Sequence, residues 1–269
     1  MSQFCRAIGT SRQNVYQRLQ KAEAEWQATQ SLRYMVDAVR RDHPRMGAKS
    51  LYTRLCPEHM GRDKFLIWYQ ENGYSVHPQK NWRRTTDSSG VVRFDNLINE
   101  LQLTDVNQVW VSDITYYELG SRFYYLTLIM DLYSRVIKGY AASQTLKCEH
   151  TTIPALKMAM RHVYKHQTPI LHSDGGGQYY SKAFLTLTKG RFLNSMGKTA
   201  YENPHAERLN GTIKNNYIKP YNPTSYGQLK SYLAKAVRMY NQEKPHQSLG
   251  KVTPFAFECQ VKLQNKQLI

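Results

Sequence analysis

A single carboxylate inside an apolar β-strand pattern is the feature that most constrains this chain. The segment from Trp110 to Tyr117 reads WVSDITYY and is rich in the β-branched and aromatic residues that suit a half-buried strand. Asp113 lies in its middle, where a buried charge is costly unless it has a cation, a hydrogen-bond network or a proton. We therefore expect a sheet whose first strand carries a functional carboxylate.

Two later acidic residues are placed where they could share a cation with Asp113. Asp174 follows PILHS, which predicts a short strand, and the GGGQ after it predicts a pliable loop. Glu207 lies in the first turn of a helix predicted from about residue 204 to residue 217. Converging carboxylates suit Mg²⁺ or Mn²⁺. We predict Asp113, Asp174 and Glu207 as catalytic and metal-binding residues, with two ions for phosphodiester chemistry.

The helix that carries Glu207 presents further polar residues on the same side. Helical spacing places Asn203, Asn210 and Lys214 there. We predict Lys214 as a phosphate contact and include the two asparagines among the DNA-binding candidates. Glu202 is the alternative acidic residue, and we expect it to be structural.

Residues 105–218 predict the central domain, of the α/β class. Three β-rich runs (VWVSDITYYEL, SRFYYLTLIMDLYS and RVIKGYAAS) are joined by short turns and predict an antiparallel meander. A helix over residues 148–164, a strand ending at Asp174, a helix, a strand over residues 191–194 and the long helix then follow. This order matches a ribonuclease H-like core with a mixed five-stranded sheet and helices.

Helical modules are predicted before this core. Residues 1–28 read as two helices around Gly9, the outline of a helix-turn-helix, which makes Arg12 and Gln13 DNA-binding candidates. Residues 29–76 predict three more helices, which form either a second helix-turn-helix-like module or a plain helical bundle.

The segments on either side of the predicted core are basic. Residues 77–104 predict a linker in which Arg83 and Arg84 could follow a phosphate backbone, with a short helix at FDNLINELQL. Residues 219–269 predict a C-terminal helical segment. Its Lys230 and Arg238 could line DNA, while its apolar side could pack against the core.

The charge balance favours a polyanionic partner. Lys and Arg total 37 against 20 Asp and Glu, a formal net charge of +17 with a pI near 9.7, and nucleic acid is the commonest such partner. No apolar run reaches the length of a membrane span, and we expect a cytoplasmic, nucleoid-associated protein. The four scattered cysteines predict reduced, buried thiols, and the histidines show no zinc-ligand spacing. No sustained heptad repeat is evident.

Four segments together resemble a known family. WVSDITYY, HSDGGGQY, YENPHAERLNGTIKN and YNQEKPHQSLGKVTP are similar to the DDE transposases encoded by the second reading frame of IS-three-type bacterial insertion sequences, in the retroviral integrase superfamily. The resemblance covers nearly the whole chain. The interval between Asp174 and Glu207 is slightly shorter than is usual in the family.

The resemblance implies a catalytic triad of Asp113, Asp174 and Glu207 accompanied by Lys214. It also implies cleavage of the element's terminal inverted repeats, strand transfer into target DNA, a homo-oligomer that pairs two DNA ends, and a first-frame partner or fusion. Two alternatives stay open: a ribonuclease H-like nuclease that only hydrolyses, and a catalytically inactive DNA-binding regulator.

Overall fold

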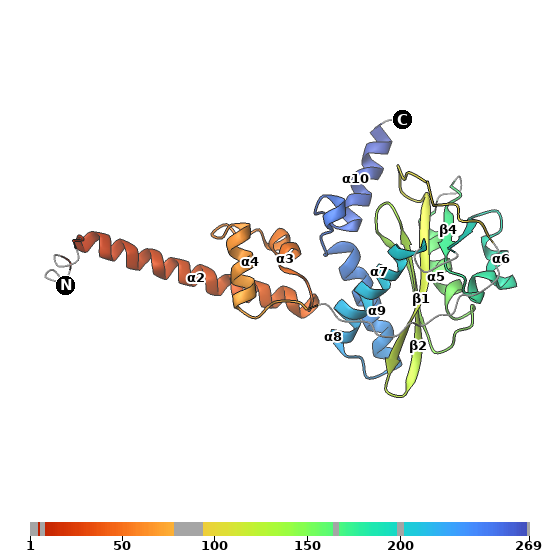
Figure 1. The fold of residues 1–269 in the computed structure, drawn as a ribbon, viewed down its shortest axis with the longest axis horizontal. Helices are drawn as coiled ribbons and strands as arrows, with labels where there is room; N and C mark the ends of the chain where they lie inside the picture. The colour runs from red at the N-terminus through yellow and green to blue at the C-terminus, as the bar shows by residue number, and fades with distance from the viewer. Residues whose placement is uncertain (1–4, 6–8, 78–93, 164–166, 198–201, 268–269) are drawn as a thin grey trace. The chain divides into compact units, whose positions relative to one another are not determined.

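The computed structural model describes residues 5, 9–77, 94–163, 167–197 and 202–267 (Figure 1). The chain forms two compact units, Met1–Val76 and His77–Ile269. The first is helical, and the second is built around one β-sheet. Among the described residues, none of the helices combines the length and the apolar character needed to span a bilayer.

Three helices make up the described part of the N-terminal unit: α2 (Arg12–Asp42), α3 (Ala48–Leu55) and α4 (Arg62–Glu71). The Ser11 hydroxyl caps α2 by accepting a hydrogen bond from the Asn14 N–H at 3.1 Å. The helices enclose a small apolar core, which consists of Leu32, Val36, Met46, Leu51, Met60, Phe65 and Tyr69. Such a core is what either the bundle or the helix-turn-helix prediction requires.

The predicted division between residues 28 and 29 is wrong, because α2 runs through it without a break. The sequence from Arg12 to Asp42 contains neither Gly nor Pro and is rich in strong helix formers, so nothing ends the helix before Pro44. The predicted helix before Gly9 lies mostly outside the described residues. The helix-turn-helix there stays a prediction.

The predicted mixed five-stranded sheet is confirmed. Its strands are β1 (Val109–Leu119), β2 (Arg122–Asp131), β3 (Ile137–Ser143), β4 (Ile170–Ser173) and β5 (Leu193–Met196). Their order across the sheet is β3-β2-β1-β4-β5. The first three strands form the antiparallel meander, and β4 and β5 run parallel to β1. β1 is therefore the central strand.

Helices cover both faces of the sheet (Figure 1). α5 (Thr152–Ala159) and α6 (Lys182–Thr188) lie on one face, and α7 (Pro204–Ile213) and α9 (Tyr226–Gln242) lie on the other. Alternate side chains of β1 feed the two cores, since Trp110 belongs to one buried cluster and Val111 to the other. The strand that carries Asp113 is thus held from both sides.

Residues 219–269, predicted as a C-terminal helical segment, contain α9 and α10 (Pro254–Gln267), and the apolar side of α9 packs against the core. Leu229, Leu233 and Val237 of α9 are buried in the same core as α7 and the meander. The last helix, α10, is joined to the sheet by a buried ion pair between Lys138 of β3 and Glu258, with 2.5 Å between Nζ and Oε2. The segment completes the sheet unit.

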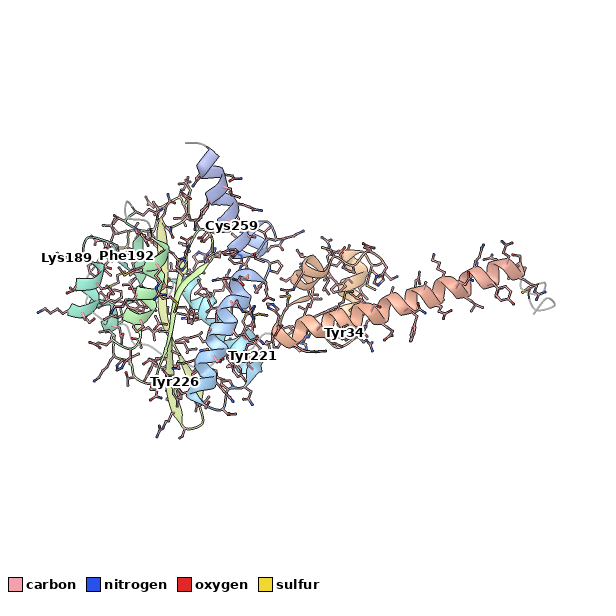
Figure 2. All side chains as sticks on the ribbon, turned by 180° about the vertical axis from the view of Figure 1, so that it is seen from behind. Tyr34, Lys189, Phe192, Tyr221, Tyr226 and Cys259 are labelled. Carbon is pink, nitrogen blue, oxygen red and sulfur yellow. The ribbon has the colours of Figure 1, made fainter. Side chains whose placement is uncertain are left out.

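Four other local predictions are corrected. FDNLINELQL is not helical, because the Asn96 side chain accepts from the Ile98 N–H at 3.1 Å and competes with helix formation. α5 begins at Thr152 and β5 at Leu193, both later than predicted. All four cysteines are free, but Cys56 and Cys259 are exposed; Cys259 is labelled on α10 in Figure 2.

Candidate active site

The parallel pairing of β1 and β4 brings two of the predicted carboxylates to one place. Ser112 of β1 lies opposite Ser173 of β4 in the register, so Asp113 and Asp174 are the next residues on adjacent strands. β4 ends at Ser173, whereas β1 continues and pairs through Asp113 with Leu128 of β2. Asp113 is therefore fixed within the sheet, and Asp174 begins the loop beside it.

One side of α7 is fastened to β1 around Asp113. Asn203 Nδ2 donates to the Ser112 carbonyl at 3.0 Å, and Asn210 Nδ2 donates to Asp113 Oδ2 at 2.8 Å. Glu207 lies between these two asparagines at helical spacing and on the same side of the helix, where its side chain is exposed. The helix thus places the third carboxylate on the side of Asp113.

The chain leaves α7 through a π-helical turn, η4 (Lys214–Ile218), so the α-helix predicted to reach Tyr217 ends at Ile213. π-Helical turns are rare in proteins overall, and those that occur are often found at functional sites. Lys214 begins the turn, and its Nζ donates to Thr115 Oγ1 at 3.1 Å and to the Tyr116 carbonyl at 3.4 Å. This lysine therefore adds a third fastening between the helix and β1.

The surroundings of Asp113 disfavour the ionised form of its carboxyl group. Burial raises its pKa to about 7, and the negative charges of Asp174 and Glu207 act in the same direction. Hydrogen bonds from the Ile114 N–H, at 2.7 Å from Oδ1, and from Asn210 oppose this rise in the pKa. Asp174 and Glu207 are therefore close enough to act electrostatically on Asp113, and a bound cation would stabilise its charged form.

Asp174 is held by its own loop. Burial raises the pKa of its carboxyl, while the Gly176 N–H donates to Oδ1 at 3.2 Å and opposes the rise. A Cβ on Gly176 would lie 3.0 Å from this same oxygen, so a side chain there would require the Asp174 carboxylate to shift by a few tenths of an ångström. Tyr180 donates to the Asp174 carbonyl at 3.3 Å.

Buried polar contacts support the strand ends behind the carboxylates. Ser112 Oγ and the buried Tyr179 hydroxyl are 2.8 Å apart, and His172 Nδ1 lies 2.9 Å from Ser195 Oγ. Glu202, the alternative acidic residue, accepts from Asn96 Nδ2 at 2.7 Å. Its carboxylate thus ties the segment before β1 to the segment before α7, which is a structural role.

The residue types at this site fit a hard divalent ion, which prefers oxygen ligands. Three carboxylates supply them, and Asn203 Oδ1 and Asn210 Oδ1 are buried with no hydrogen-bond partner among the described residues. No group of three His, Cys, Asp or Glu side chains in the described part of the chain is arranged closely enough to hold a metal. The ligand types therefore fit a divalent ion, but the side chains are not close enough together to surround one.

Three of the predicted DNA contacts are hydrogen-bonded to β1 instead. Asn203 and Asn210 are buried and bound to β1, so we no longer propose them as DNA contacts. Lys214 is half-buried, and burial lowers its pKa. The sequence showed that Asn203, Asn210 and Lys214 share a side of the helix with Glu207. It did not show that this side faces β1.

The remaining basic candidates are exposed where the structure describes them. Arg12 and Gln13 begin α2. Lys230 lies 5.2 Å from the ring centre of Tyr226, a residue labelled in Figure 2. Arg238 pairs with Glu243 at 3.3 Å. The other two candidates, Arg83 and Arg84, lie outside the described residues.

Two adjoining stretches of the chain match the integrase core domain family. Residues 104–192 match one profile described as "Integrase core domain", and residues 191–254 match a second with the same description. Together the two matches run from just before β1 through α9 to the start of α10. They include Asp113, Asp174 and Glu207.

Relatives of the chain come from bacterial insertion sequences. It is 28% identical over 264 residues to the uncharacterized 31 kDa protein of insertion element IS600 from Shigella sonnei, covering 94% of this chain and 97% of that protein. It is 30% identical over 162 residues to a putative transposase of IS986/IS6110 from Mycobacterium tuberculosis, covering 57% of this chain and 58% of that protein. The transposase InsF of IS3A from Escherichia coli is 28% identical over 156 residues, covering 56% of this chain and 54% of that protein.

Among solved structures, the catalytic core domain of HTLV-2 integrase in complex with magnesium is similar at 23% identity and a TM-score of 0.48, covering 57% of this chain and 97% of that one. The two domain matches span all five strands of the sheet and the helix that carries Glu207. The chain therefore belongs to the DDE transposases of the retroviral integrase superfamily.

Proposed function

We propose that Asp113, Asp174 and Glu207 are the catalytic carboxylates of this transposase. The observation that carries the proposal is the meeting of β1, β4 and α7 at Asp113, through the strand register and the Asn210 hydrogen bond. In this reading the chain cleaves the ends of its own insertion sequence and joins a freed 3′-hydroxyl to a target strand.

The protein groups divide the work of holding this site. Asp113 would hold divalent ions from within β1, Asp174 from the loop that follows β4, and Glu207 would complete the ligand set from α7. Asn210 orients Asp113 through Oδ2, and Lys214 fixes the helix to the strand beyond it. Two Mg²⁺ or Mn²⁺ ions, when bound, would supply the charge stabilisation and nucleophile activation for phosphodiester transfer.

Double-stranded DNA is the proposed substrate, both as the terminal inverted repeats and as target. The net charge of +17 supports binding to a polyanion. Arg12, Lys230 and Arg238 are exposed and remain candidates for phosphate contacts. Pairing of two DNA ends would require at least two copies of the chain, with a first-frame product as a further partner or fusion.

A strand-transfer assay with a pre-cut, labelled insertion-sequence end and Mg²⁺ tests the proposal. We expect wild-type protein to give joined product and Glu207→Gln to lose it by at least about 100-fold, because the exchange removes a metal-binding charge. Glu202→Gln is the matched control. It removes a carboxylate charge five residues earlier, at a structural contact, and should retain joining.

The same assay separates the alternatives. Hydrolysis of the DNA without joining would indicate a nuclease, and DNA binding without either reaction would indicate a regulator. Joining by Glu207→Gln at the wild-type rate would overturn the assignment of this residue.

A further inference from the structure

The first turns of α2 expose apolar side chains. Every residue from Tyr16 to Gln27 is exposed, and Leu19 and Trp26 are 57% and 63% exposed. A helical segment gains most of its stability in a protein from packing of an apolar face. This stretch has the apolar residues for such packing and, in a single copy of the unit, buries none of them.

The apolar residues form a stripe with heptad spacing. Val15, Leu19, Ala22 and Trp26 follow one another at intervals of four, three and four positions. Leu19 and Trp26 then occupy a positions, and Val15 and Ala22 occupy d positions. The repeat is only about two heptads long, which is too short for the sustained pattern that identifies a coiled coil from sequence.

We propose that this stripe docks against the same stripe of a second copy of the chain, as a short antiparallel helical pair. Antiparallel pairing sets each a residue against a d residue, so Trp26 would meet Val15 of the second copy and Leu19 would meet Ala22. Every layer then combines a large side chain with a small one, which fills space evenly. A parallel pair would instead place Trp26 against Trp26 and Ala22 against Ala22.

The flanking charges favour the same arrangement. Arg18 and Glu25 occupy g positions, and antiparallel helices bring g residues of the two copies together. Arg18 of each copy would therefore face Glu25 of the other. Exposed ion pairs add little stability, but opposite charges at these positions select the orientation of the pair.

The self-complementarity of the stripe is the reason for choosing a second copy as the occupant. A two-fold axis midway between Leu19 and Ala22 pairs every large residue with a small one and every g cation with a g anion, as an isologous interface requires. A DNA-binding face would be uniformly basic, whereas Lys21, Glu23 and Glu25 give this segment both signs of charge.

Site-directed disulfide formation tests the pairing and its direction in the full chain. Cys56→Ser and Cys259→Ser remove the exposed native thiols. Arg18→Cys protein is then mixed with Glu25→Cys protein, which should give a disulfide-linked heterodimer. Arg18→Cys alone should not crosslink, because its two copies would lie about 10 Å apart, beyond disulfide reach.

The parallel alternative predicts a different partner, since Arg18 would then face Glu23. We expect the Arg18→Cys and Glu25→Cys mixture to crosslink at least about ten-fold more than the Arg18→Cys and Glu23→Cys mixture, given the distance limits of a disulfide. Crosslinking mainly to Glu23→Cys would overturn the antiparallel arrangement. Absence of crosslinking in both mixtures would overturn the interface.

A charged residue in the stripe provides the second arm. Leu19→Asp, added to the crosslinking pair, should abolish heterodimer formation, whereas Gln20→Asp, on the outer side of the same turn, should leave it unchanged. The inference deepens the oligomeric part of the proposed function. Its readout is crosslinking without DNA or metal, so it can fail while strand transfer by the sheet unit still succeeds.

Discussion

Asp113 combines a proposed metal-binding role with an energetic cost. The residue is fixed in the central strand, its carboxylate is partly buried, and its neighbours Asp174 and Glu207 are also acidic. Without a cation these conditions favour the protonated form, which is why its pKa rises to about 7. A carboxylate kept at such a cost is typical of sites that bind metals.

The pKa of Asp113 predicts how metal-free protein responds to pH. Because the folded-state pKa exceeds the unfolded value, the folded state keeps a proton that the unfolded chain releases between pH 4 and pH 7. Stability should therefore fall as pH rises through this window. Asp113→Asn should remove the loss and be more stable than wild type at pH 8, by up to roughly 4 kcal/mol.

Urea unfolding with chelator at pH 5 and pH 8 measures this difference, which should be larger at pH 8. Asn210 can rotate its amide to accept from the new side chain, so the exchange leaves no clash. Added Mg²⁺ should stabilise the wild type and not the variant. An equal response of both proteins to Mg²⁺ would contradict binding at Asp113.

Asn210 should affect catalysis through Asp113. Asn210→Ala removes the 2.8 Å hydrogen bond to Oδ2, while the hydrogen bond from the Ile114 N–H to Oδ1 stays in place, so the carboxylate is held less firmly. Hydrogen bonds to charged groups contribute about 1.5–3 kcal/mol, so we expect strand transfer to slow by about 10- to 100-fold. Single-turnover rates with pre-cut DNA would measure the loss.

The matched control for Asn210 is Thr212→Ala on the same helix, whose hydroxyl donates to the Arg208 carbonyl at 2.9 Å. It should react at the wild-type rate. A positioning role for Asn210 also predicts a raised Mg²⁺ requirement, whereas simple loss of helix stability would not change the metal dependence. An unchanged requirement would therefore argue against the positioning role.

At the scale of elements, α10 is held to the sheet by charge. Lys138 is fully buried on β3 and contacts Glu258, which also accepts from Ser134 Oγ at 2.9 Å and pairs with Lys262. Burial acts to raise the pKa of Glu258, but the Lys138 charge and the hydrogen bonds prevail and lower it. Removing Glu258 would leave the Lys138 ammonium buried without its ion-pair partner, with the charge of Asp131 still acting on it.

This ion pair predicts a strong asymmetry between single and double exchanges. Glu258→Ala should destabilise the sheet unit by about 3–5 kcal/mol, while Lys138→Met combined with Glu258→Leu should be nearly neutral. Denaturant unfolding measures both. Lys262→Ala is the control, because its half-exposed ammonium can be replaced by water. A small loss for Glu258→Ala would show that α10 does not depend on the pair.

At the scale of the whole molecule, charge governs the encounter with DNA. The excess of 37 basic over 20 acidic side chains is spread along the chain. If phosphate contacts dominate, affinity for a labelled duplex should fall about 1,000-fold or more between 50 and 200 mM salt. Fluorescence anisotropy would measure this, with sucrose at matched osmolality as the control. A flat salt response would rule out the basic surfaces as the main contact.

The sequence was most informative where local pattern decides structure. The β-branched and aromatic run VWVSDITYYEL predicted β1 to its ends, and the helix predicted after Gly9 begins α2. The meander and the alternation of later helices and strands followed from the same patterns. It was less reliable at FDNLINELQL, where side-chain contacts of Asn96 with the local backbone outweigh helix periodicity.

By itself, the sequence determined that this protein has a carboxylate in a central strand and two more acidic residues, one after a strand and one in the first turn of a helix. It also determined the excess of basic residues and the resemblance to a transposase family. Only the tertiary structure decided that Asn203, Asn210 and Lys214 turn inward onto β1, and that α9 and α10 belong to the sheet unit. The physical reason is that residue spacing fixes which side chains share a helix side. What that side faces depends on contacts between segments remote in sequence, which local patterns do not encode.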